Sequence, residues 1–303
     1  MTAGRASSAP ASAVRLWIVA SRPRTLPAAV APVLVGTALA VSEDRFLALA
    51  FAAALLGSVF IQIGTNLAND YSDARRGADT EDRLGPVRVT AGGLMPPRSV
   101  LIGTYVAFGV SVLCGSYLAF VAGPEMLAVG VVSIAAGVLY TGGPRPYGYA
   151  GLGELFVFLF FGLVAVAGSY YVQAERLTAE SVALAVPVGL LAAAVLVVNN
   201  VRDLDTDRRA GKRTLAVKLG RRNARGLFVA MIVVSYAVAI AIPTFGGLSW
   251  WVLLVLGSVP LAPALVRTVI EKSDGPALNG ALAATGRLLG VYSTLLALGV
   301  LLS

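Results

Sequence analysis

The feature that most constrains this chain is a series of long apolar runs that contain almost no charged residue. Each run is close to the about 20 residues that a helix needs to cross the hydrocarbon core of a bilayer. The runs occupy residues 25–41, 46–68, 99–122, 125–141, 153–172, 181–199, 225–243, 248–266 and 281–302. This pattern predicts an all-α, polytopic membrane protein with nine transmembrane helices in a bundle.

Composition agrees with this fold class. Only 13% of the residues are charged, against about 25% in a typical soluble protein. Residues 1–12 are small and polar, and we expect them to form a disordered tail. Residues 13–303 are expected to form a single transmembrane domain, in which residues 13–24, with Trp17, make a short interfacial helix.

The basic residues are distributed unevenly between the two sides of the predicted membrane. With the N-terminus in the cytoplasm, 22 of the 24 Lys and Arg residues lie on the cytoplasmic side, and only Arg45 and Arg176 lie outside. The positive-inside rule therefore predicts a cytoplasmic N-terminus and an outside C-terminus. The same bias accounts for the net charge of +8, so nothing in the chain calls for a nucleic-acid partner.

An acidic motif follows the second apolar run. It reads NLANDYSDARRGADTED over residues 66–82, and Asn66, Asp70 and Asp73 are spaced four and three apart. On a helix these three side chains share one face. Acidic residues at the end of a membrane-spanning helix are costly unless a cation or a water-filled cavity balances them. The motif is therefore a candidate functional site.

A second acidic motif follows the sixth apolar run. Asn199, Asp203 and Asp207 are spaced four and four apart, so they also share a helix face. Both motifs place an Asn at the end of an apolar run, an Asp one turn later and another Asp within the next turn. The similarity suggests two related helical halves that face one another, with an active site on the cytoplasmic side.

The residue types in these motifs favour a hard cation as the bound metal. The chain has no His, and its single Cys, Cys114, lies in an apolar run. Clustered carboxylates and amides suit Mg²⁺, which completes its coordination with water and substrate phosphates. Nearby basic residues suit the remaining phosphate oxygens; they are Arg75, Arg76, Arg202, Lys212 and Lys218. A diphosphate with a hydrocarbon tail would match such a site, and the alternative is a set of solvated loop charges.

The two motifs resemble the Asp-rich motifs of the UbiA-type intramembrane aromatic prenyltransferases. Four segments resemble the 1,4-dihydroxy-2-naphthoate polyprenyltransferases of menaquinone synthesis more closely. They are RPRTLPAAVAPVLVG at 22–36, NDYSDARRGADTEDRLGPVRVTAGG at 69–93, YTGGPRPYGYAGLGELFVFLFFG at 140–162 and NNVRDLDTDRRAGKRTLAVKLGR at 199–221. The resemblance implies nine transmembrane helices and Mg²⁺-dependent prenyl transfer.

The resemblance also implies roles for the acidic residues and the amides. Asp70, Asp73, Asp203 and Asp207 would be catalytic. One Mg²⁺–diphosphate group would be held by Asn66, Asn69, Asp70 and Asp73, and the other by Asp203 and Asp207 with Asn199 or Asn200. Asp79 is favoured over Asp82 as a further metal ligand, and the alternative for both is that they order the loop.

Basic and aromatic residues would bind the substrates in this comparison. Arg22 or Arg24, Arg202 and Lys212 would neutralise the diphosphate, or would serve only as positive-inside anchors. Tyr140 would orient the aromatic acceptor or stabilise a cation through its ring face. The alternative for Tyr140 is an interfacial tyrosine.

The implied reaction is the prenylation of 1,4-dihydroxy-2-naphthoate by polyprenyl diphosphate in a bacterial cell membrane. CO₂ and diphosphate would be lost, and demethylmenaquinol would form. Other aromatic acceptors are open alternatives, namely 4-hydroxybenzoate, homogentisate or a chlorin. Two different classes are an ion or metabolite transporter and a CDP-alcohol phosphotransferase. A transporter site is expected near mid-membrane, whereas both motifs here lie at helix ends on the same side.

Overall fold

The computed structural model describes residues 12–78, 84–245 and 247–303. The predicted tail up to residue 11 lies outside the described residues, as do Asp79 and Asp82 of the first motif. Within the described ranges the ordered elements are all helical and no strand occurs, so the all-α prediction is confirmed for this part of the chain.

The helices follow one another with short connections. In chain order they are α1 (Ala13–Ser21), η1 (Pro23–Thr25), α2 (Pro27–Ser42), α3 (Ala48–Arg75), α4 (Pro97–Ala122), α5 (Glu125–Leu139), η2 (Tyr147–Ala150), α6 (Gly153–Val157), η3 (Phe158–Ala167), α7 (Gly168–Ala174), α8 (Ala179–Arg209), α9 (Leu215–Ala241), η4 (Ile242–Phe245), η5 (Trp250–Leu261), α10 (Ala262–Glu271) and α11 (Gly275–Leu301). Of these, η3 is a π-helix that continues α6 into α7, and η5 is a 3₁₀-helix that continues into α10.

Seven helical segments of the described chain are long and apolar enough to cross a membrane. An eighth candidate is the pair formed by Ala13–Thr25 and Pro27–Ser42, whose axes differ by 55°. The ninth predicted run, 125–141, forms α5, which has 15 residues and is shorter than the about 20 that span a bilayer. All nine runs are helical, but runs 25–41 and 125–141 do not meet the length criterion alone.

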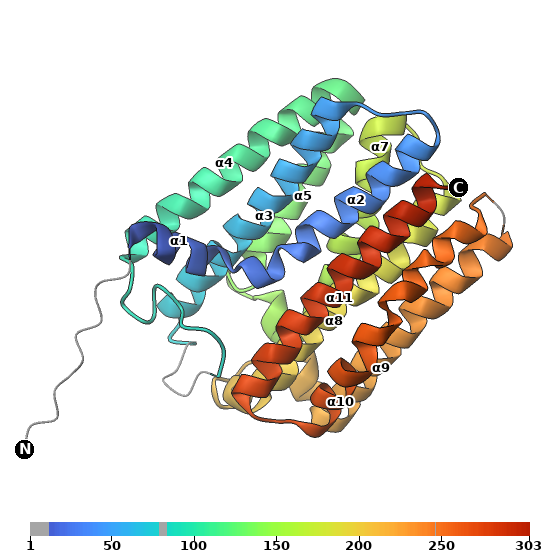
Figure 1. The fold of residues 1–303 in the computed structure, drawn as a ribbon. Helices are drawn as coiled ribbons and strands as arrows, with labels where there is room; N and C mark the ends of the chain where they lie inside the picture. Colours follow the sequence, from blue (N-terminus) through green and yellow to red (C-terminus); the bar gives the residue numbers. More distant parts are fainter. Residues whose placement is uncertain (1–11, 79–83, 246) are drawn as a thin grey trace, which may run out of the picture.

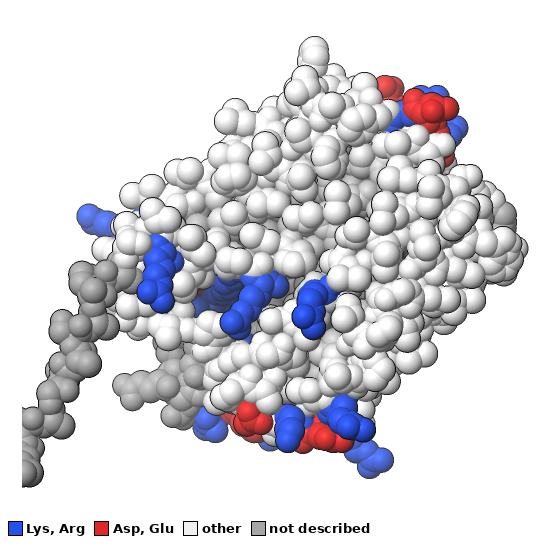
Figure 2. Space-filling model, in the orientation of Figure 1, with Lys and Arg blue, Asp and Glu red and all other residues white. Residues whose placement is uncertain are grey.

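The outer surface of the bundle matches a lipid environment. Figure 2 shows that charged side chains gather towards the ends of the bundle and leave an uncharged band between them. Large apolar side chains are exposed along the helices, including Phe120 at 88% and Leu113 at 72%. Figure 1 shows the helices side by side, with α1 and the C-terminus at opposite ends of the bundle. These features define a multi-pass membrane protein.

The core of the bundle is built around α8. Most of its apolar residues are buried, from Leu184 to Leu204, and it packs against α9, η3 and α11. Gly162 of η3 and Gly189 of α8 allow the two helices to touch, because a Cβ added at Gly162 would lie 2.7 Å from the Gly189 Cα. This central helix carries the second acidic motif.

The predicted site residues Asn66, Asp70 and Asp73 lie on α3, and Asn199, Asp203 and Asp207 lie on α8. The predicted apolar runs end at residues 68 and 199, but α3 continues to Arg75 and α8 continues to Arg209. The helices run past the apolar segments because their polar ends are satisfied by contacts with neighbouring segments. These residues are therefore held on regular helical turns, which fix the directions of their side chains.

Candidate functional site

The first motif separates into two adjacent stripes on α3. Asn69 and Asp73 face the interior cavity, whereas Asn66 and Asp70 contact the backbone of neighbouring segments. All four side chains are buried, with exposed fractions between 2% and 6%. Buried polar groups require partners, and those partners distinguish the two stripes.

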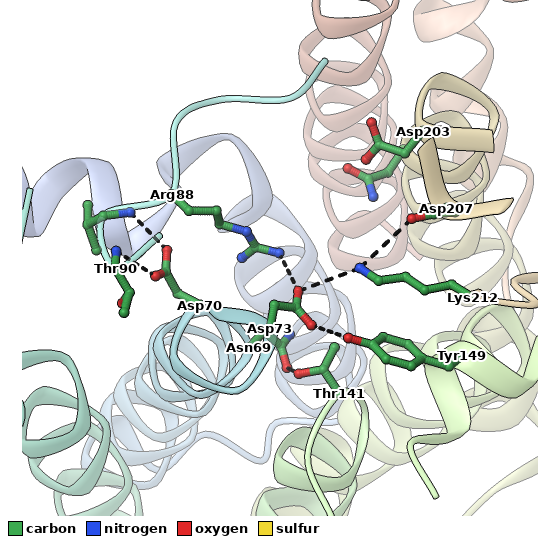
Figure 3. A network of polar contacts seen from close by, with 12 residues as sticks. Asn69, Asp70, Asp73, Arg88, Thr90, Thr141, Tyr149, Asp203, Asp207 and Lys212 are labelled. Carbon is green, nitrogen blue, oxygen red and sulfur yellow. Dashed lines mark hydrogen bonds and ion pairs between the residues drawn. The ribbon is translucent and has the colours of Figure 1, made fainter. Parts of the chain in front are cut away.

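Asn69 and Asp73 are held by side chains from three other segments (Figure 3). Thr141 Oγ1 donates to Asn69 Oδ1 at 2.8 Å. Arg88 pairs with Asp73, its Nη2 lying 2.9 Å from Oδ2. The Tyr149 hydroxyl donates to the other oxygen, Asp73 Oδ1. Asp73 is thus a buried carboxylate with a guanidinium and a phenol already directed at it.

The second stripe contacts backbone. Asp70 accepts hydrogen bonds from the Val89 and Thr90 N–H groups, at 3.1 and 2.9 Å. Asn66 Nδ2 donates to the Ser21 carbonyl at 3.0 Å. Asp70 does not line the cavity, whereas Asn66 does.

The second motif is tied together mainly within α8. Arg202 is 2% exposed, and its Nε and Nη2 lie 2.8 and 2.6 Å from the two oxygens of Asp203. The same guanidinium donates to Asn199 Oδ1 and, on α11, to Asn279 Oδ1, each at 2.8 Å. Asn200 Nδ2 donates to Glu154 Oε1 of α6 at 2.8 Å. Arg202 therefore neutralises Asp203 and links the motif to α11.

Lys212 joins the two motifs. Its Nζ lies 4.0 Å from Asp73 Oδ2 and 3.9 Å from Asp207 Oδ1 (Figure 3). The ammonium also lies 4.9 Å from the centroid of the Tyr149 ring, within the range of a cation–π contact. The chain turns back at Gly211, whose φ of 73° is in the left-handed region. This turn returns Lys212 to the cavity just after Asp207.

The two motifs open into a cavity of about 350 Å³. Its polar end is lined by both motifs and by Arg22, Arg88 and Lys212. The rest is lined mostly by apolar and small side chains of α3, α4, α5, η3 and α8. The aromatic rings of Tyr147 and Phe156 stack on this wall with centroids 4.1 Å apart. A charged head and an apolar tail fit the two ends of this cavity.

Tyr147 lines the cavity together with Tyr140 and Phe156, and these three rings form its aromatic wall. Its hydroxyl donates to the Ala136 carbonyl at 2.9 Å, and its ring contacts Tyr140 edge-on at 5.5 Å between centroids. Burial raises the pKa of the Tyr147 phenol well above its usual value. A phenol is already neutral near neutral pH, and burial favours that form further, so the side chain contributes no negative charge beside the carboxylates.

The structure brings most of the predicted site residues to this one cavity. The lining residues among them are Arg22, Asn66, Asn69, Asp73, Tyr140, Asn199, Asn200, Asp203, Asp207 and Lys212. Arg24, Asp70 and Arg202 do not line it. Arg24 is exposed, and Arg202 acts on the cavity through Asp203. Asp79 and Asp82 lie outside the described residues.

Sequence reasoning did not single out several residues that shape the site. They are Arg88, Thr141, Tyr149 and Asn279. Arg88 lies in segment 69–93, and Thr141 and Tyr149 lie in segment 140–162, both of which carry the family resemblance. The polar residues in those segments were therefore the available signal. Asn279 carried no local signal, because its contact with Arg202 joins distant parts of the chain.

The donor groups at the cavity fit a hard divalent cation. Carboxylate and amide oxygens from α3 and α8 face the same space, which is the ligand chemistry that Mg²⁺ prefers. Within the described residues, no three acidic side chains are gathered closely enough to form a metal cluster. The Lys212 ammonium supplies positive charge between Asp73 and Asp207 in this arrangement.

A bundle of apolar helices in which two acidic motifs open into one largely apolar cavity is typical of enzymes that transfer prenyl groups within a membrane. Residues 29–283 match the UbiA prenyltransferase family, and the chain belongs to this family. The family resemblance predicted from the motifs is confirmed. The chain is accordingly a membrane-embedded prenyltransferase.

Curated relatives place the chain beside one branch of the family. It is 43% identical over 287 residues to 1,4-dihydroxy-2-naphthoate octaprenyltransferase of Mycobacterium tuberculosis, covering 91% of this chain and 94% of that protein. It is 38% identical over 301 residues to the Escherichia coli protein of the same name, covering 96% and 97%.

Solved structures share the fold. A UbiA homolog from Archaeoglobus fulgidus, bound to GPP and Mg²⁺, superposes with a TM-score of 0.63 at 14% identity. The alignment covers 93% of this chain and 99% of that one. The same homolog was also solved bound to Cd²⁺, with a TM-score of 0.61. The helical bundle described above is therefore the UbiA fold.

Proposed function

We propose that the chain transfers a polyprenyl group from polyprenyl diphosphate to 1,4-dihydroxy-2-naphthoate in menaquinone synthesis. The observation that carries the proposal is the identity of 33–43% to several naphthoate octaprenyltransferases over nearly the whole chain. The cavity supports it, because its polar end suits a diphosphate and its apolar walls suit a hydrocarbon tail.

The proposed reaction replaces the ring carboxylate with the prenyl group. The bond between the allylic carbon and the diphosphate oxygen breaks, and a bond forms between that carbon and the ring. The carboxylate leaves as CO₂, and its bonding electrons restore the aromatic ring as demethylmenaquinol. No ring proton is removed, so the step needs no strong base, in agreement with a chain that has no His.

We propose Asp73, Asp203 and Asp207 as the acidic groups that hold Mg²⁺, with amide oxygens from Asn69 and Asn199. Mg²⁺ supplies positive charge that stabilises the departing diphosphate. Asp79 stays a predicted further ligand. Asn66 and Asp70 are held by backbone contacts and are left out of this set.

The protein's own residues would bind the diphosphate and protect the allylic cation. Arg22, Arg88 and Lys212 line the polar end and can pair with phosphate oxygens. The aromatic wall, including Tyr140 and Phe156, excludes water and presents ring faces to a cation. Tyr140 lines the cavity, and we propose that it orients the naphthoate acceptor.

We propose that α5 also crosses the membrane, which gives nine transmembrane helices with the motifs on the cytoplasmic side. The uneven distribution of basic residues supports this orientation. Arg176, one of the two basic residues expected outside, is paired with Glu43 at 2.8 Å. The N-terminus would be cytoplasmic and the C-terminus outside, in a bacterial cell membrane.

A panel of acceptors tests the function. The purified chain in proteoliposomes receives octaprenyl diphosphate and one of dihydroxynaphthoate, 4-hydroxybenzoate or homogentisate, with Mg²⁺ or with EDTA. We expect a prenylated product and CO₂ from dihydroxynaphthoate alone, and no product with EDTA. Absence of transfer to dihydroxynaphthoate, with transfer to another acceptor, would contradict the proposed substrate and leave the class intact.

A further inference from the structure

Asp70 fixes the backbone of a loop that carries an arginine. Its Oδ2 accepts from the Val89 N–H at 3.1 Å, and its Oδ1 accepts from the Thr90 N–H at 2.9 Å. The side chain is 2% exposed, so these contacts are shielded from water. Figure 3 shows Asp70 directed toward this loop, while Asp73 is directed toward Lys212. A carboxylate that binds two consecutive N–H groups sets the direction of the neighbouring side chains.

Arg88 is the residue directly before those two N–H groups. Its guanidinium lies 2.9 Å from Asp73 Oδ2 and lines the polar end of the cavity. The side chain is 9% exposed, so its direction depends on the loop backbone and not on solvent. Asp70 therefore acts on the cavity through the position of Arg88.

Asn66 makes an analogous contact with a second arginine-bearing segment. Its Nδ2 donates to the Ser21 carbonyl at 3.0 Å and to Thr25 Oγ1 at 3.1 Å. Thr25 Oγ1 in turn donates to the Arg22 carbonyl at 2.9 Å. Arg22 lies between these two anchors, with a φ of 53° and a ψ of 68°.

The Arg22 conformation needs support from its surroundings. A residue with a side chain rarely adopts a left-handed backbone, and such strain persists only where neighbouring contacts fix it. The following Pro23 disfavours the right-handed helical alternative for Arg22. Asn66, through Ser21 and Thr25, closes the turn that directs Arg22 into the cavity.

We propose that Asn66 and Asp70 are positioning residues that hold Arg22 and Arg88 at the diphosphate end of the cavity, and are not metal ligands. The two residues lie one helical turn apart and face the same side of α3. The proposal deepens the proposed function and rests on it, because Arg22 and Arg88 are taken to bind diphosphate. It changes the role that residue spacing alone assigns to both residues.

Two substitutions distinguish positioning from metal binding. Asn66→Asp keeps a side-chain oxygen and adds negative charge, so a metal ligand at this position would keep or tighten its metal. It removes the Nδ2 donor, so a positioning residue would lose its function. Asp70→Asn removes negative charge and replaces one acceptor with a donor facing an N–H group. The control is Asp73→Asn, the same change one turn further along α3.

The test measures metal and diphosphate binding separately. Mn²⁺ binding to the purified full chain in detergent is followed by electron paramagnetic resonance, and binding of inorganic diphosphate with Mg²⁺ is followed by calorimetry. We expect Asn66→Asp and Asp70→Asn to bind Mn²⁺ within about twofold of wild type but diphosphate about tenfold more weakly. Asp73→Asn should lose Mn²⁺. Weakened Mn²⁺ binding in Asp70→Asn, equal to that in Asp73→Asn, would overturn the proposal.

Paired substitutions test whether the effects pass through the arginines. We expect Asp70→Asn to weaken diphosphate binding less than about twofold further in an Arg88→Gln background. Asn66→Asp should behave likewise in an Arg22→Gln background. In the crossed pair, Asp70→Asn with Arg22→Gln, the two fold-losses in diphosphate affinity should multiply. If the fold-losses in diphosphate affinity also multiplied in the matched pairs, Asn66 and Asp70 would act independently of the arginines. The proposal would then fail.

Arg88→Gln keeps the test decisive if a helix variant does not fold, because it leaves α3 unchanged. We expect it to weaken diphosphate binding about tenfold and to leave Mn²⁺ binding unchanged. Wild-type affinity for diphosphate in this variant would overturn the proposal. If the wild-type chain itself binds no diphosphate, the proposed function fails with it. Transfer to a different aromatic acceptor would leave this inference standing.

Discussion

The two acidic motifs have nearly the same spacing but different connections. On α3, Asp73 contacts Arg88 and Tyr149, which come from two other segments of the chain. On α8, Asp203 contacts Arg202, its own neighbour in sequence. The first motif is therefore completed by tertiary contacts, whereas the second carries its main counter-ion on the same helix.

This difference shows that similar spacing does not give similar roles. The second motif is formed once α8 and α11 pack, because Arg202 needs only Asn199 and Asn279 to complete its contacts. The first motif is complete only when the Arg88 loop and the Tyr149 turn are in place. The α8 half thus carries its own counter-ion, and the α3 half is completed by the Arg88 loop and the Tyr149 turn.

The largest expected effect comes from removing one carboxylate in each half. Asp73→Asn and Asp203→Asn should each lower turnover about 10³-fold, since each removes a carboxylate proposed to hold the Mg²⁺ that stabilises the departing diphosphate. Transfer rates in proteoliposomes measure the loss, with helical content by circular dichroism as the control for folding. Nearly normal turnover in one variant would show that only the other half holds the metal.

Arg202 should matter more for stability than Arg88. Arg202→Gln leaves Asp203 buried without its counter-charge, and we expect the free energy of unfolding to fall by about 3 kcal/mol. Arg88→Gln should cost less, because Asp73 keeps Tyr149 and Lys212 nearby. Unfolding in mixed micelles compares the two variants. An equal loss of stability in the two variants would mean that Asp73 depends on Arg88 as strongly as Asp203 depends on Arg202.

Lys212 joins the two halves, and its removal tests that connection. Lys212→Met keeps the length of the side chain and removes the charge between Asp73 and Asp207. We expect turnover to fall about 10²-fold, because the diphosphate loses a cationic partner. Lys212→Arg, the matched control, should recover part of the rate. Tighter Mn²⁺ binding with unchanged turnover would instead show that Lys212 only neutralises the empty site.

The helical runs were predictable because each is apolar for nearly the thickness of a bilayer, which permits few other structures. The structure differs from the prediction where the local sequence pattern gave no signal or where tertiary contacts overrode it. Pro23 and Pro27 accompany the bend that separates α1 and η1 from α2. The apolar runs end at residues 68 and 199, yet tertiary contacts extend α3 to Arg75 and α8 to Arg209.

The site was predictable as a set of residues but not as a set of roles. Asn66 and Asp70 are four apart, as are Asn69 and Asp73, so each pair forms a stripe along α3. The two stripes are offset by about 60°, because three residues correspond to about 300° of rotation. Spacing alone treats Asn66, Asp70 and Asp73 as one face. The tertiary fold sets the positions of the segments that carry Arg22 and Arg88. These positions determine which contacts each stripe makes.

The smallest expected effect isolates one contact of the first motif. Tyr149→Phe removes the hydroxyl that donates to Asp73 Oδ1 and keeps the ring beside Lys212. A hydrogen bond to a charged group contributes about 1.5 kcal/mol to stability, so the free energy of unfolding should fall by about that amount. Turnover should fall at most about tenfold, because Asp73 loses one of the contacts that orient it. The control is Tyr147→Phe, whose hydroxyl donates to the Ala136 carbonyl and not to a carboxylate. Equal losses of turnover in the two variants would mean that the aromatic wall, and not the contact with Asp73, accounts for the effect. The α3 motif would then depend less on its tertiary partners than the structure indicates.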